Sequence, residues 1–150
     1  MVIDLSFWQN LIITAILIIV LFVFVLKIKK IIKKALRQRE LYGLDKKEIK
    51  RRWEEIEKLL EIKNEMSYKL AVLEADKLLD HVLKYMGFGG SSLGERLKLA
   101  CYKFNKLRQV WSAHKIRNQL VHEAAYRLGY GEARRAVSGF RKGLEELGVL

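Results

Sequence analysis

Residues that break helices or cross-link chains are scarce in this sequence. The 150 residues contain no proline and a single cysteine, Cys101. The absence of proline, and of any stretch in which Val, Ile and Thr alternate with polar residues, favours an all-helical protein. A lone cysteine cannot form a disulfide within the chain, which fits a reducing compartment. The sequence therefore predicts an all-α protein without internal disulfides.

Acidic residues are the minority charge. The chain has 17 Asp and Glu against 29 Lys and Arg, a net charge of +12. Residues 1–40 hold 7 basic and 2 acidic residues, so the remainder holds 22 basic and 15 acidic, a surplus of +7. A mildly basic domain of this kind tolerates nucleic acid as a partner without requiring it.

Charge is absent altogether between Leu5 and Leu26, where Leu, Ile, Val and Phe dominate. As a helix this stretch would span roughly 33 Å, enough for the core of a bilayer. A secretory signal peptide is the alternative, but it would begin with basic residues, whereas this segment begins with Asp4 and ends in lysines. We therefore expect residues 1–26 to be a retained N-terminal transmembrane anchor, with Phe7 and Trp8 at the membrane interface.

A basic stretch follows the apolar run at once. It occupies residues 27–44 and is predicted to continue the helix beside the membrane. The positive-inside rule then predicts a single-pass protein of the cell membrane, with its N-terminus outside and its C-terminal domain in the cytoplasm. Membrane lipid is the expected partner of the lysines nearest the apolar run, which are Lys27, Lys29, Lys30, Lys33 and Lys34.

Residues 45–150 are predicted to form a bundle of four or five helices. Asp45 and Glu48 have the spacing of a capping box that opens the first helix. Apolar residues three and four apart then predict further helices over about 68–86, 92–104, 106–128 and 132–147. Gly87 and Gly129 are expected to end the second and fourth of these five helices.

The glycine-rich loop at residues 88–94 is a possible phosphate-binding loop. Such a loop needs a lysine and a hydroxyl residue at its end, but this one continues into Glu95. The sequence therefore excludes a nucleotide-binding loop. Ser92 and Glu95 form instead a second capping box, which opens the helix over 92–104.

The helix expected over 106–128 carries an unusual set of polar residues. Arg117 and His122 lie about 140° apart around its axis, with Asn118 between them and His114 within the same arc. Arginine is well suited to bind phosphate, and histidine is the usual acid or base near neutral pH. These residues therefore suggest chemistry on a phosphodiester.

Two other interpretations of these residues can be weighed. A zinc site is excluded because His114 and His122 are about 12 Å apart along the axis, so no metal or other cofactor is predicted. A structural role is the stronger alternative. In that case Arg117 pairs with an acidic residue such as Asp76, while Asn118 and His122 satisfy buried groups between helices.

The segment from Arg117 to His122 resembles the Arg-x4-His motif of the HEPN superfamily, in the form where asparagine follows the arginine. Its place in a late helix of a bundle is also similar, and the resemblance covers residues 68–147. Many members of that family are metal-independent endoribonucleases that act as dimers, with motif residues of both protomers facing one cleft. The resemblance thus implies RNA as substrate, a homodimer and no cofactor.

The resemblance also implies a role for each residue of the site. His122 would move the proton as a ribose 2′-OH attacks the adjacent phosphate, and Arg117 would stabilise the charge on the phosphoryl oxygens. Asn118 would orient the histidine or the phosphate. Some branches of the family use an acidic residue on an earlier helix, which here would be Glu74 or Asp76, and His114 is a further supporting candidate.

Two functions from different classes stay open at this point. The first is a membrane-anchored HEPN-like endoribonuclease. The second is a non-catalytic, membrane-tethered HEPN-like module that dimerises or binds RNA, nucleotide or an unidentified protein. One well-known ribonuclease branch has a tyrosine two residues after the histidine. This chain has Ala124 there, which argues against membership in that branch. The two functions are distinguished by whether Arg117 and His122 open onto one solvent-accessible groove.

Overall fold

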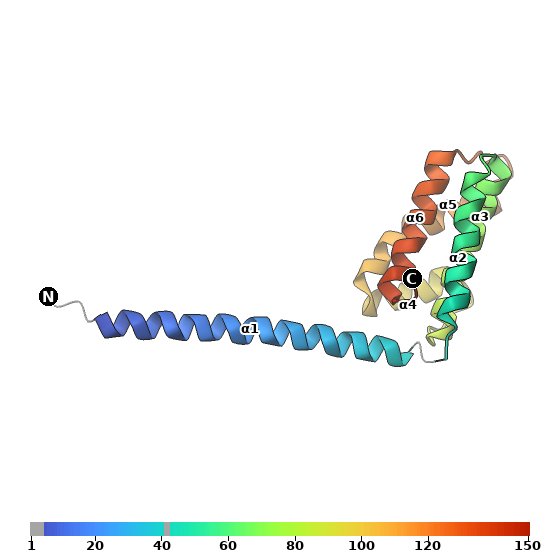
Figure 1. Ribbon diagram of the computed structural model, residues 1–150. Helices are drawn as coiled ribbons and strands as arrows, with labels where there is room; N and C mark the ends of the chain where they lie inside the picture. Colours follow the sequence, from blue (N-terminus) through green and yellow to red (C-terminus); the bar gives the residue numbers. More distant parts are fainter. Residues whose placement is uncertain (1–4, 41–42) are drawn as a thin grey trace. The chain divides into compact units, whose positions relative to one another are not determined.

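The computed structural model describes the backbone of residues 5–40 and 43–150, and the side chains of residues 13–32 and 43–150. Across these residues there are α-helices, one 3₁₀ helix and no strand, so the predicted all-α class is confirmed. The elements, shown in Figure 1, are α1 (Leu5–Glu40), α2 (Lys46–Glu61), α3 (Glu65–Tyr85), α4 (Leu93–Lys103), the 3₁₀ helix η1 (Asn105–Val110), α5 (Trp111–His122) and α6 (Tyr130–Leu147).

The chain divides into two compact units, Met1–Glu40 and Leu41–Leu150. The first contains only α1, which is continuous through the point where the anchor was expected to pass into the basic stretch. The second contains all other helices and corresponds to the predicted bundle.

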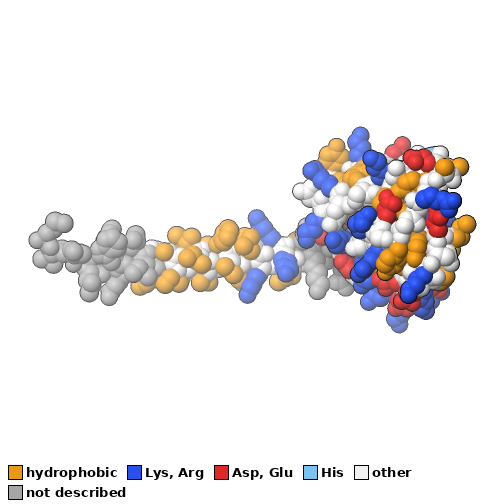
Figure 2. Space-filling model, turned by 90° about the horizontal axis from the view of Figure 1, so that it is seen from above, with side chains coloured by type: hydrophobic (Ala, Val, Ile, Leu, Met, Phe, Trp, Pro, Cys, Tyr) orange, Lys and Arg blue, Asp and Glu red, His pale blue; other side chains and the backbone are white. Residues whose placement is uncertain are grey.

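The predicted fold class needs one correction, which concerns the single transmembrane helix. In the part of the chain that the structure describes, no helix is both long and apolar enough to cross a membrane. A span needs about 20 predominantly apolar residues. The described side chains of α1 reach that length only by including Lys27, Lys29 and Lys30. Figure 2 shows basic side chains directly after the apolar part of this helix. The side chains of Phe7, Trp8, Lys33 and Lys34 lie outside the described residues.

Helix α3 is the centre of the bundle. It packs against α2, α4, α5 and α6, and α2, α3 and α6 lie side by side in Figure 1. The apolar residues on its core-facing side recur three and four apart and are buried, as are those on the core-facing side of α6, so the two helices share most of the core. Those of α3 are Ala71, Val72, Ala75, Leu78, Leu79, Val82 and Leu83, and those of α6 include Ala136, Val137, Phe140, Leu144 and Leu147.

The helix starts predicted at Asp45 and Ser92 are confirmed, whereas α3 begins at Glu65, before its predicted start near Tyr68. The carboxylate of Asp45 accepts hydrogen bonds from the backbone N–H groups of Lys47 and Glu48 at the start of α2. At the end of α3, Gly87 has φ of +81°, and the N–H of Phe88 donates to the carbonyl of Leu83. This left-handed residue satisfies the last carbonyls of the helix, as expected of Gly87.

The helix that carries the motif is shorter than predicted. Its first part is the separate 3₁₀ helix η1, and α5 ends at His122 and not near Leu128. The buried side chain of Leu128 and the hydrogen bond from its N–H to the Glu65 carboxylate hold the following loop against α3. Gly129 therefore precedes α6 as its N-cap, with φ of −80°, and does not close the motif helix.

The carboxylate of Glu65 is the anchor of that loop. It forms ion pairs with Lys69 at 2.9 Å and with Arg127 at 3.0 Å, and it accepts the N–H of Leu128. The Lys69 and Arg127 contacts lower the pKa of Glu65 to about 2. Tertiary contacts of this kind, which join residues more than 60 positions apart, cannot be seen in local periodicity, and for that reason the end of α5 was predicted too late.

Candidate functional site

A buried carboxylate on α3 organises the candidate site. The side chain of Asp76 is only 3% exposed. This acidic residue lies among the apolar residues on the core-facing side of α3. Its Oδ1 lies 2.7 Å from Nδ1 of His114, and its Oδ2 lies 3.1 Å from Nε of Arg117. An ionised carboxylate only accepts hydrogen bonds, so opposite such a carboxylate Nδ1 of His114 is the donor.

His114 and Arg117 reach the same carboxylate because they are three residues apart on α5. Residues at this spacing lie on one side of a helix. The His114 ring is buried and stands edge-on to the ring of Trp111, with centroids 6.0 Å apart. The Arg117 Nε is also fully buried, and its contact with Asp76 is an ion pair without well-aligned hydrogen-bond geometry.

The motif residues open onto one cavity of about 400 Å³. All three predicted catalytic residues, Arg117, Asn118 and His122, line it, together with Asp76, Lys77, Asp80, Ser91, Ser92, Leu93, Arg96 and His114. Nη1 of Arg117 donates to Oδ1 of Asn118 at 3.2 Å. Arg117 and Asn118 are half-buried, whereas His122 is exposed at the last position of α5. The three motif residues provide a guanidinium group, an amide and an exposed imidazole to a ligand in the cavity.

The cavity is also lined by residues that were not predicted to belong to the site. Arg96 of α4 binds both carboxylate oxygens of Asp80, at 2.7 and 3.0 Å, and it also donates to the carbonyl of Gly90. The Asp80 carboxylate raises the pKa of Arg96. This cluster holds the glycine-rich loop at the rim, so Ser91 and Ser92 line the cavity. One available signal was that Arg96 falls within the apolar stripe of Leu93, Leu97 and Ala100.

The two acidic candidates on α3 have different surroundings. Asp76 lies at the centre of the cluster, in contact with His114 and Arg117. Glu74 does not line the cavity, and its carboxylate forms a surface ion pair with Lys77 at 2.7 Å. The residue that could support the motif is therefore Asp76.

A metal site was not predicted, and the relevant side chains can be located. Among the residues that the structure describes, no group of three or more His, Cys, Asp or Glu side chains is placed to hold a metal ion. Cys101 is buried in the core side of α4.

Known proteins supply no assignment for this cavity. No protein-family model, no curated protein and no solved structure matches the chain. A functional assignment therefore depends on the chemistry of the cavity and on the resemblance of the motif.

Proposed function

We propose that residues 45–150 are a HEPN-like domain that cleaves RNA without a metal ion, using Arg117, Asn118 and His122. One observation carries this proposal: the three side chains line a single cavity, and His122 in it is exposed to solvent. Residues whose only role was to hold helices together would be buried within one protomer.

The proposed reaction is an internal transfer at phosphorus. The ribose 2′-OH gives its proton to a histidine and attacks the adjacent phosphorus, and the bond to the 5′-oxygen of the next nucleotide breaks. That oxygen takes a proton, so the products end in a 2′,3′-cyclic phosphate and a 5′-OH. His122 moves the proton, and the fixed charge of Arg117 stabilises the phosphoryl oxygens, where preorganised charge has its largest effect.

A second copy of the chain completes the proposed site. The reaction needs both a base and an acid, but the cavity has only one exposed histidine, His122. His114 is buried and its Nδ1 is engaged by Asp76. Two apolar side chains of α5, Trp111 and Val121, are 40% and 51% exposed, which suits burial against a partner. A homodimer with two facing motifs would supply the second histidine.

A non-catalytic HEPN-like module for dimerisation or for binding of RNA, nucleotide or protein is the second candidate function. It is favoured by the contact between Arg117 and Asp76, because an arginine that pairs with a buried carboxylate can serve packing alone. The two functions differ in whether they need the imidazole of His122. A residue that only holds helices together does not need to be exposed to solvent.

The direct test is cleavage of RNA by the purified full-length chain. We expect a mixed-sequence single-stranded RNA to be cut in the presence of EDTA, with products ending in a 2′,3′-cyclic phosphate, as identified by mass spectrometry. The same RNA with 2′-O-methyl riboses is the control, because it lacks the attacking hydroxyl. Cleavage of the methylated strand, or none of the unmodified strand, would contradict the proposal.

The assembly can be measured separately. We expect sedimentation of the full-length chain at micromolar concentration to reveal a dimer. Val121→Asp should shift it towards monomer, because it places a charge in the proposed apolar interface beside His122. Ile62→Asp is the matched control, since Ile62 is similarly exposed but lies at the end of α2. Equal dissociation of both variants would refute an interface at α5.

A further inference from the structure

A second cavity, of about 560 Å³, lies along α6 and has no acidic residue in its lining. It is lined by Gln109, Ser112, Tyr130, Gly131, Arg134, Arg135, Ser138, Gly139 and Lys142. None of these residues lines the cavity of His122. The lining therefore combines three cations with hydroxyl and amide groups that donate hydrogen bonds.

The cations of this cavity are available to a ligand. Arg134, Arg135 and Lys142 are exposed, and within the described part of the chain no carboxylate lies within 4.0 Å of them as an ion-pair partner. Arg141 of the same helix is different, because Glu57 and Glu145 both pair with it. Arg135 and Lys142 are seven residues apart and thus lie on one face, about 10 Å apart along the axis. This is enough to contact more than one phosphate of a strand.

An aromatic residue stands at one end of the row of cations. Tyr130 is 48% exposed, and its ring packs on that of Tyr68 with centroids 5.5 Å apart. Arg134 and Tyr130 line both this cavity and a neighbouring one, which Tyr68 also lines. The carboxylates of that neighbour, Glu57 and Glu61, come from α2. An exposed ring beside unpaired cations is the arrangement that binds an unpaired base and its backbone.

We infer that this α6 groove, defined by Tyr130, Arg134, Arg135 and Lys142, is a binding surface for single-stranded RNA, separate from the cavity of the motif. Phosphates contact the three cations, and a base stacks on Tyr130. The choice of RNA rests on the proposed function, but binding in the α6 groove requires none of the cleavage chemistry. A duplex fits less well, because its bases are already paired and stacked.

The test is binding of a fluorescent 2′-O-methyl oligouridine of 12 nucleotides to the full-length chain, measured by anisotropy over a range of salt. The methyl groups block attack by the 2′-oxygen, so binding is measured without cleavage. We expect Arg134→Ala/Arg135→Ala/Lys142→Ala to weaken binding and to reduce the slope of log K against log salt by about 2, at roughly 0.7 for each contact to a single strand.

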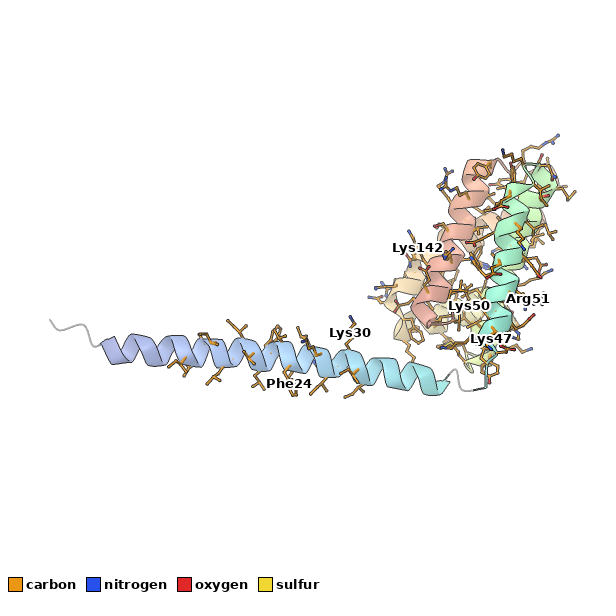
Figure 3. All side chains as sticks on the ribbon, in the orientation of Figure 1. Phe24, Lys30, Lys47, Lys50, Arg51 and Lys142 are labelled. Carbon is orange, nitrogen blue, oxygen red and sulfur yellow. The ribbon has the colours of Figure 1, made fainter. Side chains whose placement is uncertain are left out.

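The matched control removes the same charge from α2, by Lys47→Ala/Lys50→Ala/Lys58→Ala. Lys47 and Lys50 are exposed on α2, and they are labelled with Lys142 in Figure 3. This variant should change the salt slope by much less. Tyr130→Ala should weaken binding on the order of tenfold, because a stacking surface is lost, and Tyr130→Phe should bind as wild type.

Each outcome supports or overturns the inference. Equal losses in the two triple variants, or wild-type binding by Tyr130→Ala, would show general attraction to a positive protein and would overturn it. Equal affinity for a duplex of the same length would do so as well. If the α6 groove variant binds as wild type while RNA is still cleaved, the groove inference fails and the proposed function stands. If binding maps to the α6 groove and unmodified RNA stays intact, cleavage fails and the groove stands.

Discussion

Replacement of His122 by alanine is expected to lower the rate of RNA cleavage by about 10²- to 10⁴-fold, the usual contribution of a positioned proton-transfer group. His122 is exposed at the last position of α5, so its loss should change the free energy of unfolding by no more than about 0.5 kcal/mol. The measurement is the single-turnover cleavage rate, with thermal unfolding followed by circular dichroism in the same buffer.

His81→Ala is the matched control for this variant. His81 is also an exposed histidine near a helix end, but it lies on α3 and does not line the cavity of the motif. We expect it to leave both the rate and the stability unchanged. A normal rate for His122→Ala, or an equal loss in His81→Ala, would remove His122 from the chemistry and favour the non-catalytic module.

Cleavage activity is expected to depend on the shape of the Arg117 side chain as well as on its charge. Arg117→Ala removes a charge-assisted phosphate contact and should lose activity. Arg117→Lys should recover only part of it, because an ammonium group cannot reproduce the planar fork that reaches both Asp76 and Asn118. Full rescue by lysine would mean that only a diffuse positive charge is needed at this position.

Much of the bundle could be predicted from the sequence because its helices are marked by local signals. The apolar residues of α3 and α6 recur at helical spacing, and Asp45, Ser92 and Gly87 have the capping roles expected of them. Such signals depend on neighbours within four residues, and these are visible in the sequence. The transmembrane helix was predicted from the apolar composition, the length and the flanking charges of one segment, and it is the part of the fold class that is corrected.

The surroundings of the motif could be predicted only in part. The pairing of Arg117 with Asp76 was anticipated as a structural alternative, but the contact of Asp76 with His114 was not. The position of the glycine-rich loop at the cavity rim, held by Arg96 and Asp80, was also missed. The two missed contacts between side chains, Arg96 with Asp80 and His114 with Asp76, join residues that are 16 and 38 positions apart. Which residues come into contact depends on how α3, α4 and α5 pack, and no local sequence pattern specifies that packing.

Asp76 is expected to be the most stability-sensitive polar residue of this cluster. Asp76→Ala removes the hydrogen-bond partner of the buried His114 Nδ1 and the ion-pair partner of Arg117. Removing one partner of a buried ion pair typically costs about 3–5 kcal/mol. In a domain of this size that loss lowers Tm by roughly 10–20 °C, as measured by differential scanning calorimetry of the full-length chain.

Asp76→Asn separates shape from charge at the same position. An asparagine has one carbonyl oxygen and one NH₂ group, so it offers an acceptor to one of His114 and Arg117 and turns its own donor towards the other. Its stability should therefore lie between those of wild type and Asp76→Ala.

Glu74→Ala, two residues away, is the matched control. It removes only a surface ion pair with Lys77, which contributes at most about 1 kcal/mol. If Asp76→Ala and Glu74→Ala unfold at the same temperature, the buried carboxylate does not hold α5 on α3. The positions of Arg117 and His122 would then need another explanation.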